Sequence, residues 1–133
     1  MPSENTIGSK IHYFCTASGK AILAFVPEEN VKRILERGMP RYTQNTILSR
    51  EAFFENMRHA QEQGFALSEQ EFEEGINAIA APIFNNKSKP IASVSIAGPA
   101  YRLTRERMIE IGPSLVDTAN NIAREVEMAV NLE

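Results

Sequence analysis

The clearest pattern along the chain is a hairpin of two apolar runs. Together with the residues that lead into the first run, this hairpin core spans residues 64–98. The runs, Ile76–Phe84 and Ile91–Ala97, are rich in β-branched and small apolar residues, and the polar tract 85–89 separates them. Two such runs joined by turn-forming residues are typical of antiparallel strands. In Phe65–Glu69, large apolar residues alternate with small or polar ones, which predicts a third, half-buried strand.

Helical periodicity predicts helices on either side of this hairpin. The expected helices are Ala17–Phe25, Glu28–Arg37, Arg50–Gln63 and a long C-terminal helix at Arg105–Asn131. Thr16, Ser49 and Thr104 each precede one of these helices, and their side chains are favoured N-caps. The last helix has the longest apolar stripe, and Gly112-Pro113 inside it should kink or restart it.

The order of elements defines the expected fold class. A short strand at Ile11–Phe14, three helices, three strands and a long helix predict an α+β fold with an antiparallel sheet flanked by helices. Three or four strands make a thin sheet for so much helix, which indicates a sheet that is incomplete or is completed by another chain. The length of 133 residues suits one domain, so residues 1–133 are expected to form a single unit.

Composition narrows the function classes. The chain has 14 basic and 17 acidic residues, a net charge of −3, and its basic residues are scattered, so direct contact with nucleic acid is not expected. No apolar run approaches the roughly 20 residues that span a bilayer, and the first residues lack the basic start and apolar core of a signal peptide. The single cysteine, Cys15, excludes an internal disulfide and fits a reducing cytoplasm.

Candidate catalytic groups are few. Cys15 precedes a helix start, where a thiolate is favoured, and His12 is near it in the sequence, so a cysteine hydrolase is one hypothesis. A nucleophile needs a base that a third group orients, and the sequence offers no such set. Packing among small residues is the preferred interpretation of Cys15, and a solvated surface position is that of His59.

An acidic tract begins at the end of the predicted strand Phe65–Glu69 and leads into the hairpin. It contains Glu69, Glu71, Glu73 and Glu74. Carboxylate oxygens bind hard cations, but this spacing matches no metal-binding loop and no histidine accompanies it. The preferred interpretation is a solvated acidic loop, and no metal, cofactor or catalytic site is expected.

Two stretches can hold a small molecule between them. Residues 16–21 are mostly small, and a helix start of that kind exposes backbone N–H groups that favour an anion. Ser95 and Ala97 share one face of the last strand, where a serine among alanines leaves room and a hydrogen-bonding group. Close packing of a helix on the sheet explains the same residues, and for the helix start it is the preferred explanation.

Four stretches stand out in order along the chain: GSKIHYFCTASGKAILAF at 8–25, RYT with NTI at 41–47, Gly64–Ala81, and VSIAGP at 94–99. Together they resemble the C-terminal effector-binding domain of IclR-type bacterial transcriptional regulators. Their order and spacing agree with that family from about residue 7 to the C-terminus. Each motif alone is modest, but the four together are strong.

The resemblance implies a GAF-like domain that binds a small metabolite, such as an organic acid or an aromatic carboxylate, and forms dimers or tetramers. In this family a separate N-terminal winged helix-turn-helix domain contacts DNA. That domain and the first helix and strands of the sensor are not in this sequence, so a partial effector-binding domain is expected. Carried over by motif position, the ligand-binding residues are Ile11, Tyr13, Ala17, Ser18, Ser68, Ile76, Ala78, Ser95 and Ala97.

The sequence departs from the family at positions that bear on the ligand. Phe14 and Phe72 stand where histidine is usual, Ala78 stands where cysteine is usual, and Ser68-Glu69 replaces an Asp-Asp pair. Fewer polar groups and an added aromatic ring suggest a less polar effector than a two- or three-carbon acid.

Two leading hypotheses follow. The first is a sensing and oligomerisation domain of a cytoplasmic transcriptional regulator, which binds a small effector and has no chemistry of its own. The second is a self-association module without ligand binding, whose contact surface is the apolar stripe of Arg105–Asn131.

Overall fold

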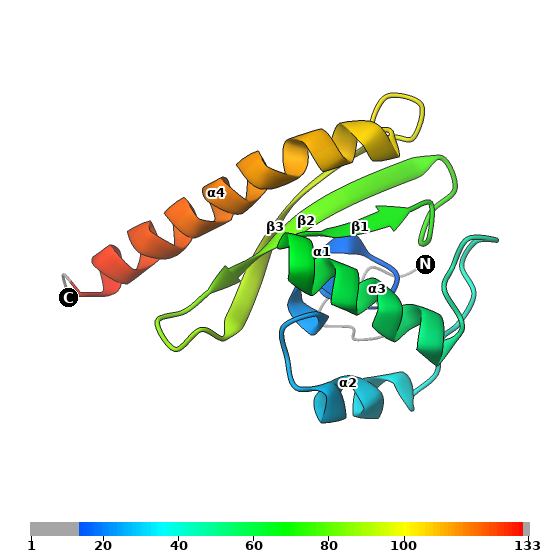
Figure 1. Ribbon diagram of the computed structural model, residues 1–133, viewed down its shortest axis with the longest axis horizontal. Coiled ribbons are helices and arrows are strands. Elements are labelled where there is room, and N and C mark those ends of the chain that lie inside the picture. The colour runs from blue at the N-terminus through cyan, green and yellow to red at the C-terminus, as the bar shows by residue number, and fades with distance from the viewer. Residues whose placement is uncertain (1–13, 132–133) are drawn as a thin grey trace, which may run out of the picture.

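The described part of the chain forms an antiparallel sheet with helices on both faces. The computed structural model describes residues 14–131. Its elements are α1 Ala17–Leu23, α2 Glu28–Leu35, α3 Arg50–Gln63, β1 Ala66–Glu69, β2 Ile76–Phe84, β3 Pro90–Pro99 and α4 Arg105–Asn131. α4 lies along one face of the sheet, and α1, α2 and α3 lie on the other side (Figure 1).

The register of the strands sorts side chains by size. The strand order is β1-β2-β3, and both pairs are antiparallel. Ser68, Ala78 and Ala97 lie side by side across the three strands. The neighbouring row consists of larger apolar residues: Leu67, Ile79 and Ile96. Because successive side chains of a strand point to opposite faces, the sheet has a small-residue face and a large-residue face.

The first half of α4 covers the large-residue face. Its buried residues Met108, Leu115 and Ala119 belong to one core cluster with Ile79 and other sheet residues. α4 continues as one helix through Pro113, so of the two predicted outcomes at Gly112-Pro113, a kink or a restart, the restart does not occur. Proline removes one backbone hydrogen bond, but the packing of Met108 before it and Leu115 after it on the sheet keeps both halves in place.

α1 and α3 pack on the small-residue face. Ala66 and Ala80 of the sheet share a core cluster with residues of both helices, among them Ala21 and Phe53. α1 begins at its predicted cap, because the Thr16 side chain accepts a hydrogen bond from the Gly19 N–H.

The boundaries of these helices have local causes. In α3 the Ser49 side chain accepts from the Ala52 N–H, and Gly64 ends the helix with a φ of +90°. α1 and α2 each end two residues before the predicted position. At those ends Phe25 donates to the Ile22 carbonyl, and Arg37 to the Ile34 carbonyl, so the last turn tightens to three-residue hydrogen bonds.

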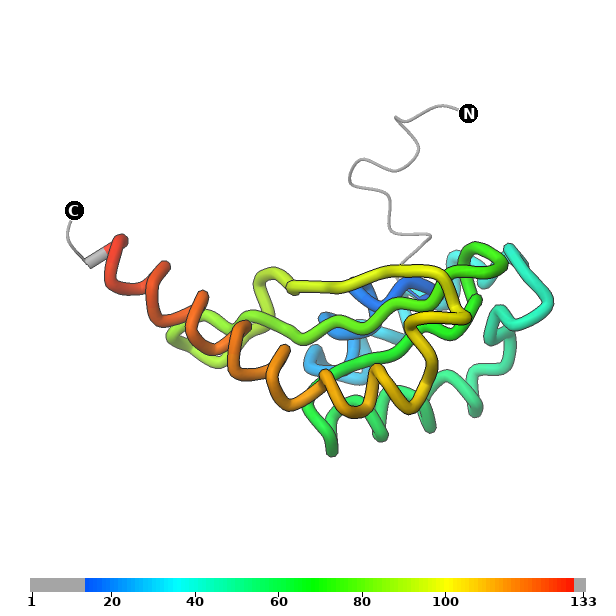
Figure 2. Tube along the Cα trace, turned by 90° about the horizontal axis from the view of Figure 1, so that it is seen from above, coloured from blue at the N-terminus to red at the C-terminus, as the bar shows by residue number. Residues whose placement is uncertain are grey.

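Part of the apolar surface is uncovered. Among the described residues, β3 pairs with a strand on one side only. The last turns of α4 extend past the β2–β3 hairpin (Figure 2), where Val126 and Val130 are 46% and 62% exposed. These two residues are four positions apart and share one face of the helix, and we call them the α4 strip. Between the strip and the hairpin end lies a groove of about 220 Å³ that Phe84 and Ile91 also line.

The predicted α+β class, with an antiparallel sheet flanked by helices, is confirmed. Arg50–Gln63, Ile76–Phe84 and Arg105–Asn131 have the expected bounds, whereas β3 is longer than expected and β1 begins at Ala66. The expected strand Ile11–Phe14 lies outside the described residues except for Phe14, which is buried in a turn.

Gly112 is needed for the contact between α4 and the sheet. A Cβ at Gly112 would lie 2.2 Å from the Cε2 atom of the Phe65 ring. Gly112→Ala should therefore lower the free energy of unfolding by on the order of 1–2 kcal/mol, because the overpacking outweighs the gain in helix propensity. Urea denaturation measures the change.

Two variants serve as controls for Gly112→Ala. Ser114→Ala changes an exposed residue of the same helix and should leave stability within about 0.5 kcal/mol. In the Phe65→Leu background, which lacks the ring, Gly112→Ala should cost less. An equal cost in both backgrounds would show that the ring contact is not the cause.

Candidate functional site

A cleft lies where the start of α1 meets the small-residue face of the sheet. Its volume is about 250 Å³. Residues from α1, β1, the β1–β2 loop, β2 and β3 line it: Thr16, Ala17, Ser18, Ser68, Phe72, Glu73, Ile76, Ala78, Ser95 and Ala97. The side chains under the cleft are small because the register aligns Ser68, Ala78 and Ala97. Space therefore remains between the sheet and the first turn of α1.

The structure brings the predicted ligand-binding residues together at this cleft. The set includes Ala17, Ser18, Ser68, Ile76, Ala78, Ser95 and Ala97. The other two predicted residues, Ile11 and Tyr13, lie outside the described residues. Sequence reasoning missed three lining residues, Thr16, Phe72 and Glu73. Their neighbours Ala17 and Ser18, and the departure at Phe72 from the usual histidine, were the available signals.

The lining combines hydroxyl groups with carbon surface. Ser18 and Ser95 contribute hydroxyls, Phe72 and Ile76 contribute larger apolar side chains, and Glu73 is exposed. No basic residue lines the cleft among residues 14–131. The arrangement suits a small molecule with an apolar body and few hydrogen-bonding groups.

Ser68 also has a structural role. Its Oγ donates a hydrogen bond of 2.8 Å to the Cys15 carbonyl, and both residues are buried. This bond joins β1 to the residue before the α1 cap, so it fixes the height of the helix start above the sheet.

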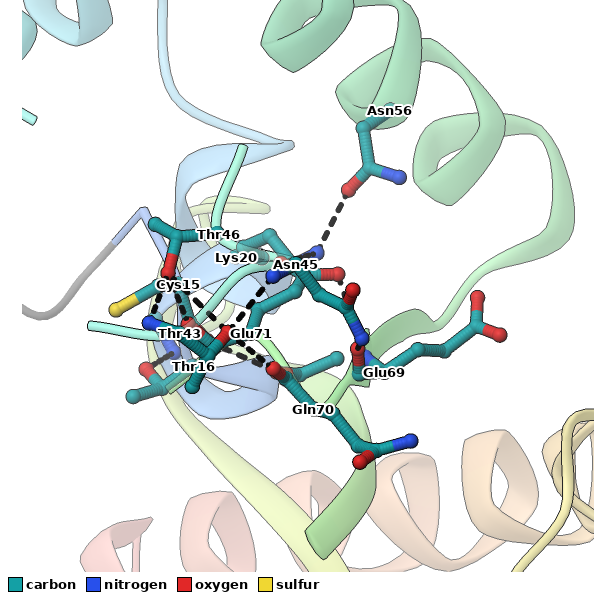
Figure 3. A network of polar contacts seen from close by, with 12 residues as sticks. Cys15, Thr16, Lys20, Thr43, Asn45, Thr46, Asn56, Glu69, Gln70 and Glu71 are labelled. Carbon is teal, nitrogen blue, oxygen red and sulfur yellow. Dashed lines mark hydrogen bonds and ion pairs between the residues drawn. The ribbon is translucent and has the colours of Figure 1, made fainter. Parts of the chain in front are cut away.

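A buried polar network stands behind the cleft (Figure 3). Lys20 of α1 has no exposed surface, and its Nζ lies 2.8 Å from Oε1 of Glu71 and 2.8 Å from Oδ1 of Asn56. Glu71 is in the β1–β2 loop and Asn56 is in α3. One ammonium group thus joins three segments.

Burial makes this ion pair energetically important. It lowers the pKa of Lys20, and the negative charge of Glu71 opposes part of that shift. Removing one member of a buried pair leaves an uncompensated charge, which typically costs about 3–5 kcal/mol. Neither residue can therefore be replaced alone without local rearrangement.

The segment 42–46 also holds the β1–β2 loop, through hydrogen bonds to the loop backbone. Thr43 Oγ1 donates to the Gln70 carbonyl, and Thr46 Oγ1 donates to the Glu71 carbonyl at 2.7 Å. Both threonines are buried. Gln70 has a φ of +56°, and its side-chain Oε1 accepts from the Gly75 N–H. The loop is thus held along its backbone as well as through Glu71.

The structure corrects the interpretation of the acidic tract as a solvated loop. Glu73 and Glu74 are exposed, but Glu71 is only 6% exposed and faces Lys20. Oε2 of Glu69 lies 2.8 Å from Nη1 of Arg105 in a partly exposed ion pair. A signal for the buried pair exists in the sequence. Lys20 falls three residues before the apolar Leu23, on the core face of α1, where a lysine requires an acidic partner.

Cys15 and the histidines do not form a catalytic set among the described residues. Cys15 is fully buried, and burial, with the charge of Glu71, raises the pKa of its thiol to about 12. The expectation that a thiolate is favoured here is therefore wrong, and the preferred interpretation of Cys15 as a packing residue is confirmed. His59 is exposed beside Glu55, as predicted. His12 lies outside the described residues.

Neither a metal centre nor a membrane span is found within residues 14–131. No group of three or more His, Cys, Asp or Glu side chains there is placed to hold a metal ion. None of the helices described is long and apolar enough to cross a bilayer.

Comparison of the sequence with known proteins identifies a family. Residues 2–124 match the family model described as bacterial transcriptional regulator IclR C-terminal. The chain is 34% identical over 118 residues to the HTH-type transcriptional repressor AllR of Salmonella paratyphi A, an alignment that covers 88% of this chain and 43% of the repressor. The chain thus spans less than half the length of that curated relative.

Solved structures agree with the sequence comparison. The C-terminal domain of the Escherichia coli transcriptional regulator KdgR is 36% identical, with a TM-score of 0.76, and the match covers 84% of this chain and 69% of that one. A double mutant of the PobR inducer-binding domain from Acinetobacter, solved in complex with 3-hydroxybenzoic acid, is 28% identical, with a TM-score of 0.77 over 84% of this chain and 65% of that one. These similarities confirm the GAF-like fold.

The thiol of Cys15 should be unreactive in the folded chain. A pKa of about 12 against an ordinary value of 9.0 makes the thiolate about a thousandfold rarer at pH 8, and burial excludes the reagent. We expect iodoacetamide to label Cys15 more than a hundredfold faster in urea than in buffer, as measured by mass spectrometry. Equal labelling rates would revive the hypothesis of a reactive cysteine.

Proposed function

Since this chain belongs to the IclR family of bacterial transcriptional regulators, we propose that it senses a small organic or aromatic carboxylate and self-associates. In the whole regulator it would control DNA binding by a separate winged helix-turn-helix domain. The observation that carries the proposal is the cleft of about 250 Å³ between the start of α1 and the strands that bear Ala78 and Ala97.

The chemistry of the cleft favours an aromatic or similarly apolar carboxylate over a two- or three-carbon acid. Phe72 and Ile76 offer apolar contact to a ring, and Ala78 and Ala97 leave room for it. The hydroxyls of Ser18 and Ser95 supply hydrogen bonds for the carboxylate. A double mutant of the related PobR domain is solved with 3-hydroxybenzoic acid, which supports the same class of ligand here.

The proposed mechanism is binding alone. A ligand in the cleft would contact α1, the β1–β2 loop and β3 at once, so it would favour the conformation in which these three segments lie close together. It shifts an equilibrium between states only by the difference between its affinities for them. The bound form would in this way favour one arrangement of subunits, and no covalent step is involved.

A second candidate function is self-association without a ligand. The observation that favours it is the exposed α4 strip, Val126 and Val130, beside the half-exposed Ile91. Apolar side chains that gather at one end of a helix often mark a contact surface. In this case association would not respond to small carboxylates.

A panel of carboxylates tests the sensing function. Benzoate, 3-hydroxybenzoate, pyruvate and glyoxylate are added to the chain in a thermal-shift assay. An aromatic carboxylate at about 100 times its dissociation constant should stabilise the fold by roughly 2.7 kcal/mol, whereas the two smallest acids should give less. A flat response to the whole panel counts against sensing of carboxylates by this chain.

A pair of variants on β3 tests the location of binding. Ala97→Phe fills the cleft and should weaken binding of the best carboxylate at least tenfold. Ile96→Phe places the same ring at the next residue, on the opposite face of β3, and should leave binding within about twofold. Equal affinities for both variants, measured by calorimetry, would place the ligand elsewhere.

Sedimentation velocity tests the second candidate. Val126→Glu places a charge in the α4 strip and should weaken self-association at least tenfold, because a charged group at an apolar contact must lose its water. Asn120→Glu adds the same charge at an exposed polar position of α4 and should have little effect. Association that both variants retain would exclude the strip as the contact.

A further inference from the structure

Two walls of the cleft are joined behind it by one ion pair. Lys20 follows Ser18 by two residues, and Ser18 lines the cleft from α1. Glu71 directly precedes Phe72 and Glu73, which line the cleft from the β1–β2 loop. The ammonium and carboxylate groups, 2.8 Å apart, are therefore close in sequence to both walls without lining the cleft themselves.

We propose that Lys20 and Glu71 are positioning residues of the cleft, whose ion pair sets the distance between the start of α1 and the β1–β2 loop. Asn56, which accepts from the same ammonium group, extends this control to α3. The consequence for affinity rests on the proposed function, because it requires that a small molecule bind between these walls. The control of loop position itself does not require a ligand.

Contacts along the loop explain why one pair can have this effect. Thr43 and Thr46 hold the carbonyls of Gln70 and Glu71, so the first half of the loop is fixed from outside. The Glu71 carboxylate also accepts from the Glu69 N–H, at 3.3 Å through Oε2. Glu71 in turn makes its polar contact with α1 through Lys20, and the course of the loop residues after Glu71 depends on this contact.

A charged pair positions its neighbours in a way that apolar contact does not. The two groups meet at hydrogen-bond distance and in one orientation, so they fix both the separation and the angle of the two backbones. Two apolar side chains of similar volume fill the same space and can preserve stability, but they permit a range of separations. This difference separates a positioning role from a purely structural one.

The decisive variant is therefore Lys20→Met/Glu71→Leu, which replaces the pair by apolar side chains. Glu71→Gln breaks the pair and leaves the lysine charge buried. Glu74→Gln is the matched control, because Glu74 lies in the same loop, is exposed and does not line the cleft. Urea denaturation gives the global stability of each variant.

Hydrogen exchange measures how firmly the two walls of the cleft are held when no ligand is present, through the protection of their amides. The informative amides are those of Gly19 and Lys20 in α1, of Gly75 at the end of the loop and of Ile76 at the start of β2, all of which donate hydrogen bonds in the structure. We expect these amides to exchange at least tenfold faster in the double variant and in Glu71→Gln. Amides of α4 should exchange at the rate that the global stability sets, and Glu74→Gln should match the unaltered chain.

The result that overturns the proposal is a double variant with unaltered exchange at these four amides, or with exchange that rises uniformly along the chain. Either would show that the pair contributes stability only. Calorimetry with 3-hydroxybenzoate supplies the second readout, and its affinity should fall at least tenfold in the double variant. If the unaltered chain binds none of the carboxylates while the local exchange pattern appears, sensing fails as a function and the positioning role stands.

Discussion

The alternation of small and large side chains along β2 is the constraint from which the rest of the structure follows. Ile79 and Ile83 belong to the core cluster that includes α4, whereas Ala78 and Ala80 pack with the helices on the other side of the sheet. A helix over alanine lies closer to a sheet than a helix over isoleucine. α1 therefore packs closely on the small-residue face. The space that remains between the start of α1 and Ala78 is the cleft.

The close approach of α1 has an electrostatic consequence. At the depth of Ala21 and Leu23 a lysine cannot extend its ammonium group into water, and Lys20 has no exposed surface. A charge in this environment needs a partner of opposite sign, because water no longer solvates it. Glu71 supplies that partner from the loop after β1, and the loop can deliver it only if its own backbone is held in a defined course.

The hydroxyls of Thr43 and Thr46 hold that course by donating to two successive carbonyls of the loop. Residues of α1, α3, the connection before α3 and the β1–β2 loop thus depend on one another, although they are far apart in the sequence. The motifs that contain Lys20, Thr43, Thr46 and Glu71 were apparent as separate stretches. Their common role appears only when the fold brings them together.

Features with a local determinant could be predicted from the sequence. The side chains of Thr16 and Ser49 cap the helices that they precede, and Gly64 ends α3 with a left-handed backbone. Strand alternation placed Ser95 and Ala97 on one face. Motif resemblance brought residues of three strands and a helix into one set, and the structure gathers the seven described members of that set at the cleft.

Features in which the tertiary environment overrides the local rule could not be predicted in this way. A glutamate in an acidic tract is ordinarily solvated, and a cysteine before a helix ordinarily has a lowered pKa. Both rules assume access to water. Glu71 and Cys15 are buried and so have no access to water. No local sequence pattern shows how closely α1 packs on the sheet.

The cleft and the groove beside the α4 strip are both lined by residues of the β2–β3 hairpin. Ser95 and Ala97 of β3 lie at the cleft, while Phe84 and Ile91 at the other end of the hairpin line the groove beside the α4 strip. β3 is held by backbone pairing on one side only among the described residues, so contacts with its side chains have a large share in fixing its position. Under the proposed function, a ligand that binds Ser95 would restrain this edge strand, and with it the hairpin end that forms half of the groove. Sensing and self-association would then be two effects of one strand, which gives a physical reason for both to reside in one small chain.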